Sequence, residues 1–125
     1  MNALAEDWVE KAEEDYGSAG VLLPYAALYP SVICYHYQQS AEKYLKAFIM
    51  EQNIFPPRIH NLLSLMNGCA TYDSSFHSLY PQLDLLTQYA VDFRYPGADA
   101  NDVEARDAYQ AASDVRTFVR SKLFI

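Results

Sequence analysis

The segment that decides the fold is Ile33-Cys34-Tyr35-His36-Tyr37-Gln38-Gln39-Ser40-Ala41-Glu42-Lys43-Tyr44-Leu45-Lys46-Ala47-Phe48. Apolar or small side chains recur in it every three or four residues, at positions 33, 37, 41, 44, 45 and 48. Because an α-helix turns once in about 3.6 residues, this spacing places them on one buried face. The segment therefore predicts a long core helix, with Ser31 as its cap and an end near Glu51, before Asn53.

A polar stripe follows the same predicted helix, formed by His36, Gln39, Lys43 and Lys46 at spacings i, i+3, i+7 and i+10. Lysine can hold phosphate oxygens and a histidine ring can stack on a base, so the stripe is a candidate binding surface. Each residue also has a structural interpretation. His36 and Gln39 could satisfy backbone groups between helices, and Lys43 could extend along the bundle. For each residue taken singly, the structural role is favoured.

Helix signals continue on both sides of this segment. Asn2 predicts the cap of a first helix that runs to about Leu23, where Pro24 would stop it. A short third helix is predicted from about His60 to Asn67. It should end at Gly68, a natural residue for a left-handed C-terminal turn.

The last third of the chain predicts two more helices. Pro81 must lie in the first turn of the fourth helix, kink it or split it, and we expect a kink or a late start near Tyr80. Asn101 and Glu104 have the spacing of a capping box, which predicts a last helix that ends near Lys122. Its inner face should hold Val103, Ala108, Ala111, Val115, Phe118 and Val119.

No strand pattern competes with these helices. The chain of 125 residues is predicted to be one domain, residues 1–125, with an all-α fold: an up-and-down bundle of four to five helices. No run approaches the about 18 apolar residues of a membrane span, and Met1 to Asp7 lack the pattern of a secretory signal. We therefore expect a cytoplasmic protein with no membrane association.

Charge and cysteines limit the possible ligands. The net charge of −7 argues against broad binding to nucleic acid, because lysine and arginine supply most of such affinity. Six acids among residues 1–15 are best interpreted as a solvated helix face. Cys34 and Cys69 are predicted to be buried, reduced thiols. The sequence predicts no cofactor and no metal site.

Two further landmarks accompany the core helix: Arg58-Ile59-His60-Asn61-Leu62 opens the third predicted helix, and Phe93-Arg94-Tyr95-Pro96 closes the fourth. In wording and spacing, these segments together resemble the HEPN domain family, over nearly the whole chain. Members of that family are small helical bundles of prokaryotes and higher eukaryotes that bind nucleotides or cut RNA. His60, Arg94 and Tyr95 join the polar stripe as candidate nucleotide-binding residues.

The ribonucleases of the family use an arginine followed four to six residues later by a histidine. That spacing is absent here, since no arginine stands four to seven residues before His36, His60 or His77. The resemblance therefore implies a non-catalytic module: a homodimer that pairs with a separately encoded minimal nucleotidyltransferase, as in a toxin–antitoxin system, and binds ATP or GTP.

Two alternatives remain open. One is a divergent ribonuclease toxin, in which His36 or His60 acts with Arg94 or Lys43, because metal-independent RNA cleavage needs a proton acceptor beside a cation. The other is a helical scaffold or interaction protein without a ligand.

Overall fold

A computed structural model describes residues 1–89, 96 and 99–125, and every regular element among them is helical. These residues form five α-helices: α1 (Ala3–Leu22), α2 (Pro30–Glu51), α3 (Leu62–Ala70), α4 (Tyr80–Thr87) and α5 (Asp102–Lys122). Two short 3-10 helices, η1 (Leu23–Tyr25) and η2 (Ser74–Leu79), precede α2 and α4. The prediction of an all-α bundle of four to five helices is confirmed.

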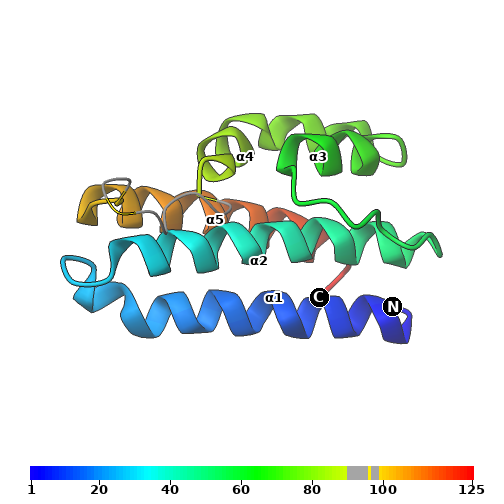
Figure 1. Ribbon diagram of the computed structural model, residues 1–125. Helices are drawn as coiled ribbons and strands as arrows, with labels where there is room; N and C mark the ends of the chain where they lie inside the picture. The colour runs from blue at the N-terminus through cyan, green and yellow to red at the C-terminus, as the bar shows by residue number, and fades with distance from the viewer. Residues whose placement is uncertain (90–95, 97–98) are drawn as a thin grey trace.

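Helix α2 occupies the centre of the bundle, as Figure 1 shows. Helix α1 runs antiparallel along one side of α2, α5 packs on another side, and the shorter α3 and α4 lie across the top. The six apolar or small positions predicted to face the core are all buried, at 33, 37, 41, 44, 45 and 48. The helical period of the deciding segment was therefore interpreted correctly.

Helix α1 begins at the predicted cap. The Asn2 side-chain oxygen accepts a hydrogen bond from the Ala5 amide (2.8 Å), and the Asn2 side-chain amide also donates to the Met50 carbonyl (2.8 Å). One residue therefore opens α1 and contacts the end of α2. Helix α1 ends at Leu22, and the chain continues as the 3-10 helix that contains Pro24.

The start of α2 differs from the prediction. The helix begins at Pro30. Proline suits the first helical position because it has no amide hydrogen, and an amide hydrogen there would have no partner within the helix. Ser31 is not the cap. Its hydroxyl instead accepts a hydrogen bond from the Ala100 amide (3.0 Å), which joins the start of α2 to the approach to α5. At the other end, Glu51 is the last helical residue, and Asn53 takes a left-handed conformation with φ of 61°.

The predicted limits of the third helix were wrong. Asn61 is its cap, accepting a hydrogen bond from the Ser64 amide (3.0 Å), so His60 lies outside the helix. The helix also continues through Gly68 to Ala70. The local preference of glycine for a terminus is overridden because Cys69, the next residue, packs in the core.

Helix α4 begins at Tyr80 with Pro81 in its first turn, so the predicted late start is confirmed. The predicted end of this helix, Phe93 to Tyr95, lies outside the described residues. Among the described residues, no helix is both long and apolar enough to cross a membrane.

Helix α5 opens with the predicted capping box: Asn101 accepts from the Glu104 amide (2.8 Å), and Glu104 accepts from the Asn101 amide (3.2 Å). The prediction for the inner face of α5 is wrong at one position, because Val103 is 60% exposed. Ala105 and Ala112 are buried in its place, one helical turn from Ala108 on either side.

Candidate functional site

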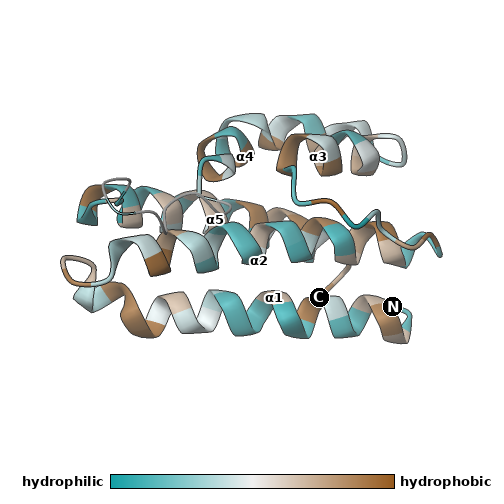
Figure 2. Ribbon diagram, in the orientation of Figure 1, coloured by the Kyte–Doolittle hydropathy of each residue, from teal (hydrophilic) through white to brown (hydrophobic). Residues whose placement is uncertain are grey.

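Two buried carboxylates organise the polar side of the bundle. Asp15 comes from α1 and Glu42 from α2, and both are almost without solvent contact. Figure 2 shows hydrophilic residues at mid-length on both α1 and α2, which lie side by side there. Because a buried charge is costly unless it is paired, each carboxylate requires cationic or hydrogen-bonding partners.

Asp15 receives two residues of the predicted stripe. One of its oxygens contacts Nδ1 of His36 (2.8 Å), and the other accepts a hydrogen bond from the Lys43 ammonium (2.5 Å). The two side chains stay partly open to solvent, 30% for His36 and 25% for Lys43. They therefore hold α2 against α1 while part of each remains accessible.

Glu42 contacts two further candidate residues, Lys46 and His60. One of its oxygens accepts from the Lys46 ammonium (3.2 Å), and the other contacts Nδ1 of His60 (2.9 Å). The Lys46 ammonium is buried and also lies over the Trp8 ring, 5.5 Å from its centroid. Lys46 is thus occupied inside the bundle.

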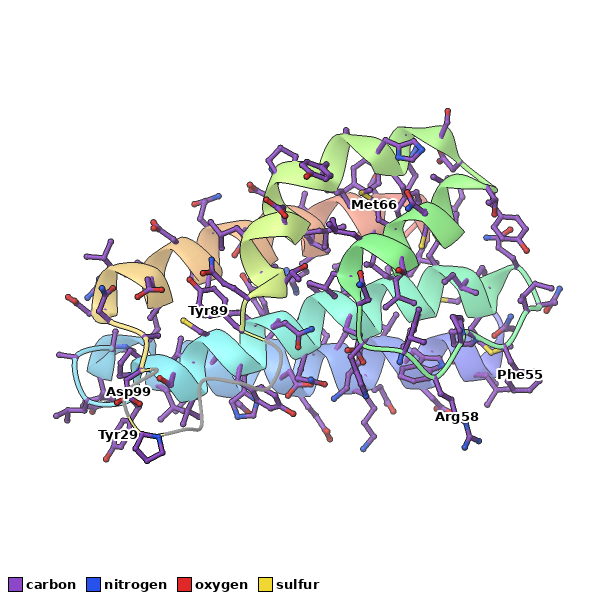
Figure 3. The ribbon with its side chains drawn as sticks, turned by 45° about the horizontal axis from the view of Figure 1, so that its top comes forward. Tyr29, Phe55, Arg58, Met66, Tyr89 and Asp99 are labelled. Atoms are coloured by element: carbon purple, nitrogen blue, oxygen red, sulfur yellow. The ribbon has the colours of Figure 1, made fainter. Side chains whose placement is uncertain are left out.

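His60 lies in the segment between α2 and α3. Its side chain is 69% exposed although Nδ1 reaches the buried Glu42. The contact ties this segment to α2, so His60 points toward the polar stripe and does not cap α3. Arg58, two residues earlier, points away from the helices (Figure 3).

Gln39 is half-buried, and its amide nitrogen donates to the side-chain oxygen of the neighbouring Gln38 (3.1 Å). Gln38 is fully buried, and its own amide nitrogen has no hydrogen-bond partner among the described residues. Gln39 thus satisfies one atom of a core glutamine. Arg94 and Tyr95 lie outside the described residues.

The structure therefore places five of the seven candidate residues on or beside α2. His36 and Lys43 meet at Asp15, Lys46 and His60 meet at Glu42, and Gln39 lies between His36 and Lys43 in the sequence. The adjacent positions of Glu42 and Lys43 join the two groups into one polar seam.

Sequence reasoning missed a third network, on another side of α2. Glu13 of α1 accepts hydrogen bonds from Arg116 (2.6 Å) and Arg120 (3.1 Å) of α5, and Arg120 also donates to the Tyr44 hydroxyl (3.2 Å). Partial burial raises the pKa of Glu13, but hydrogen bonds and charges from Arg116 and its neighbours outweigh it, so the pKa lies below its usual value. Hydrogen bonding to Glu13 in turn raises the pKa of Arg116.

Two members of the acidic N-terminal cluster were consequently misinterpreted. Asp15 and Glu13 are not part of a solvated face, since each joins α1 to another helix. A sequence signal existed, because positions 12, 15 and 19 share the buried face of α1. The rest of the cluster, such as Glu6 and Glu10, is exposed as expected.

The polar seam contains groups that could take part in acid–base chemistry. A histidine whose Nδ1 contacts a carboxylate has a fixed orientation, and its Nε2 can accept a proton. Cleavage of a phosphodiester also needs a cation at the phosphate. Both lysines of the stripe are held by the same carboxylates that orient the histidines. Among the described residues, no group of three side chains could hold a metal ion.

Comparison with known proteins gives the same fold. A family model for the HEPN domain matches residues 5–122. The crystal structure of TT1696 from Thermus thermophilus is similar, with a TM-score of 0.84 and 25% identity over 98% of this chain and 99% of that chain. The structure of ST0689, described as an archaeal HEPN homologue, has a TM-score of 0.64 and 22% identity, over 98% of each chain. No curated protein sequence matches the chain.

Proposed function

This chain belongs to the HEPN domain family, and on that premise we propose that it is a non-catalytic helical module that acts by binding. Its proposed partner is a separately encoded minimal nucleotidyltransferase, in a system of the toxin–antitoxin type. The proposal includes a cytoplasmic location, a homodimer and a nucleotide ligand.

One observation carries the non-catalytic part of the proposal. The histidines and lysines that an RNA-cleaving site would need are joined to Asp15 and Glu42, and through them they connect α1, α2 and the segment before α3. A buried carboxylate that loses its partner strongly destabilises the fold. The need to pair Asp15 and Glu42 is therefore a sufficient structural reason for these histidines and lysines. The family's arginine–histidine spacing is also absent from the sequence.

Two assays on the purified protein test this part. The protein is co-expressed with any minimal nucleotidyltransferase encoded beside its gene, and the pair is examined by size-exclusion chromatography with light scattering. RNA cleavage is measured for the wild type, His36→Ala and His60→Ala. A stable complex without cleavage is the expected result. Cleavage that is lost in either histidine variant would favour the divergent ribonuclease instead.

The nucleotide is the second part of the proposal. It is supported by the partial exposure of His36 and Lys43, which converge on Asp15 from one helix face. A phosphate group would compete with the Asp15 carboxylate for the same two donors. Asp15 therefore sets the strength of phosphate binding, by repulsion and by competition.

Calorimetric titration with ATP and GTP tests this competition. We expect micromolar binding by the wild type, weaker binding by Lys43→Ala, and tighter binding by Asp15→Asn, in which the competing charge is gone. Lys11→Ala is the matched control, since Lys11 is an exposed lysine of α1. If neither nucleotide gives heat with any of these proteins, the ligand part of the proposal is wrong and the module binds protein alone.

A further inference from the structure

A groove of about 270 Å³ separates α4 from α5, on a part of the bundle that the polar seam does not reach. Its apolar surface comes from Pro81 and Leu85 of α4 and Ala111 of α5. Asp107 and Asp114 of α5 line the same groove. From its shape and charge we infer that this groove docks a cationic, amphipathic helical segment of a partner protein.

The charge of the groove carries the first step. Asp107 and Asp114 are its ionisable lining residues, and neither belongs to an ion pair within the part of the chain that the structure describes. Asp107 is exposed and Asp114 is half-buried, whereas the buried acids Asp15 and Glu42 each have a lysine partner. The groove therefore presents an uncompensated negative charge on an apolar floor, which complements a lysine or arginine.

The amides in the groove carry the second step. Gln110 donates to one oxygen of Asp114 (2.9 Å), and Gln82 donates to the other at a longer distance (3.4 Å). This arrangement leaves the side-chain oxygen of Gln82 buried and without a donor among the described residues. The two neutral amides orient the Asp114 carboxylate without cancelling its charge, which stays available to a cation of the partner.

The third step is the length of the α5 face that contains the groove. Gln82 of α4 contacts Asp114 of α5, and Tyr89, two residues after α4, contacts Glu104 (3.4 Å), so the two segments run in opposite directions. The exposed Val103 lies one turn before Asp107 on the same face of α5. From Val103 to Asp114 the helix rises about 16 Å, which is enough for about three turns of a partner helix.

Asp107 and Asp114 stand seven residues apart, which is about two turns of α5. The partner segment should therefore carry two basic residues about two turns apart, with leucine-like side chains between them for the floor. The two carboxylates repel phosphate, so the groove does not suit RNA. This inference rests on the proposed function only in its claim that the protein acts by binding a partner.

A synthetic helical peptide of three to four turns, built from leucine and lysine in this spacing, is the probe. Its affinity for the full chain is measured by fluorescence anisotropy at physiological salt. The test variants are Asp107→Asn, which removes an exposed group, and Asp107→Asn/Asp114→Asn. The matched control is Glu6→Gln/Glu10→Gln, which changes the net charge equally on the exposed face of α1.

We expect the double groove variant to bind the peptide about tenfold or more weakly, and the control to stay within about twofold of the wild type. Asp107→Asn should fall between them, and Val103→Ser should weaken binding without any change of charge. Equal losses in groove and control variants would overturn the inference, since they show attraction by net charge alone. So would the absence of any loss in the groove variants.

The groove and the proposed nucleotidyltransferase can fail separately. If the peptide binds in a groove-dependent way but no nucleotidyltransferase complex forms, the docking site is supported and the nucleotidyltransferase is not its partner. A nucleotidyltransferase that binds the double groove variant as tightly as the wild type would keep the partner and overturn the groove as its docking site.

Discussion

Arg116 in α5 donates hydrogen bonds to both carboxylate oxygens of Glu13 in α1, from Nε at 3.0 and 3.1 Å and from Nη2 at 2.6 Å. The two residues are 103 positions apart in the sequence. Because α1 and α5 each pack mainly on α2, this pair joins the two outer helices directly. Arg116 also lies over the Tyr16 ring, 4.8 Å from its centroid, which fixes the plane of the guanidinium.

Glu13→Gln should lower the free energy of unfolding at pH 7 by about 1–3 kcal/mol, because it weakens charge-assisted hydrogen bonds and leaves two arginines without their carboxylate. Urea unfolding followed by circular dichroism gives this value. Glu14→Gln is the control, since Glu14 is exposed and pairs with the likewise exposed Lys11, and it should change stability by less than about 0.5 kcal/mol. Equal effects of the two substitutions would remove the role assigned to Glu13.

The same contact predicts a pH dependence. The pKa of folded Glu13 lies below its ordinary value of 4.5, so its charged form stabilises the native state above that pH. This stabilisation is lost as the pH falls below 4.5 and through the folded pKa. The stability difference between the wild type and Glu13→Gln should therefore shrink with acidification. A difference that stays constant from about pH 7 to about pH 3 would contradict the pairing.

Lys46→Met should destabilise the protein by about 3–5 kcal/mol, because it leaves His60 as the remaining ion-pair partner of the buried Glu42 carboxylate among the described residues. The combined replacement Glu42→Leu/Lys46→Met should recover most of the loss, since no buried charge remains. Both values come from denaturant unfolding. If Lys46→Met alone leaves stability unchanged, the Lys46 ammonium is not held inside the bundle.

Gly68→Ala should stabilise the protein by up to about 1 kcal/mol, because position 68 lies within α3 and alanine favours a helix over glycine. A Cβ at this position would meet Ile49 Cδ1 at 3.6 Å, an ordinary van der Waals contact. Gly20→Ala in α1 is the companion variant, since a Cβ there has open space. Thermal unfolding measures both. If Gly68→Ala is less stable than the wild type, the result would favour the left-handed helix end at Gly68 that the sequence predicted.

The two cysteines should resist thiol reagents in the native protein. Burial raises the pKa of Cys34 to about 12, with further contributions from the charges of Glu104 and Asp107, and burial raises the pKa of Cys69 to about 12. Because the thiolate is the reactive form, alkylation near neutral pH should be slow until the protein unfolds. Mass spectrometry after iodoacetamide treatment, with and without denaturant, measures this. Rapid native labelling of either residue would show that its site opens.

Local signals predicted the elements well. The period of the segment 33–48 identified α2, and the caps at Asn2 and Asn101 were found because a helix start depends on a few adjacent residues. Where packing opposed a local preference, the prediction was wrong, as at Gly68 and Val103. In both places the buried side of the helix, and not the residue itself, decides the outcome.

The candidate site could be predicted only in part. The polar stripe was visible from spacing, but its partners Asp15 and Glu42 depend on how α1 and the segment before α3 align with α2. Such alignment is not encoded in any short stretch. Ser31 shows the same limit, because its hydroxyl accepts from Ala100, which lies 69 positions later.

Asn2 gives the α1–α2 pair a property that neither helix would have alone. Its backbone amide donates to Glu51 (2.8 Å), while its side chain caps α1 and holds the Met50 carbonyl. Helix ends normally fray, and their amide hydrogens exchange with solvent faster than those of the helix centre. Here the start of α1 is clamped to the end of α2, so local opening of either end must break contacts of both. The amides of Ala5 and Glu6, which both donate to Asn2, should therefore exchange late, together with those of the last turn of α2.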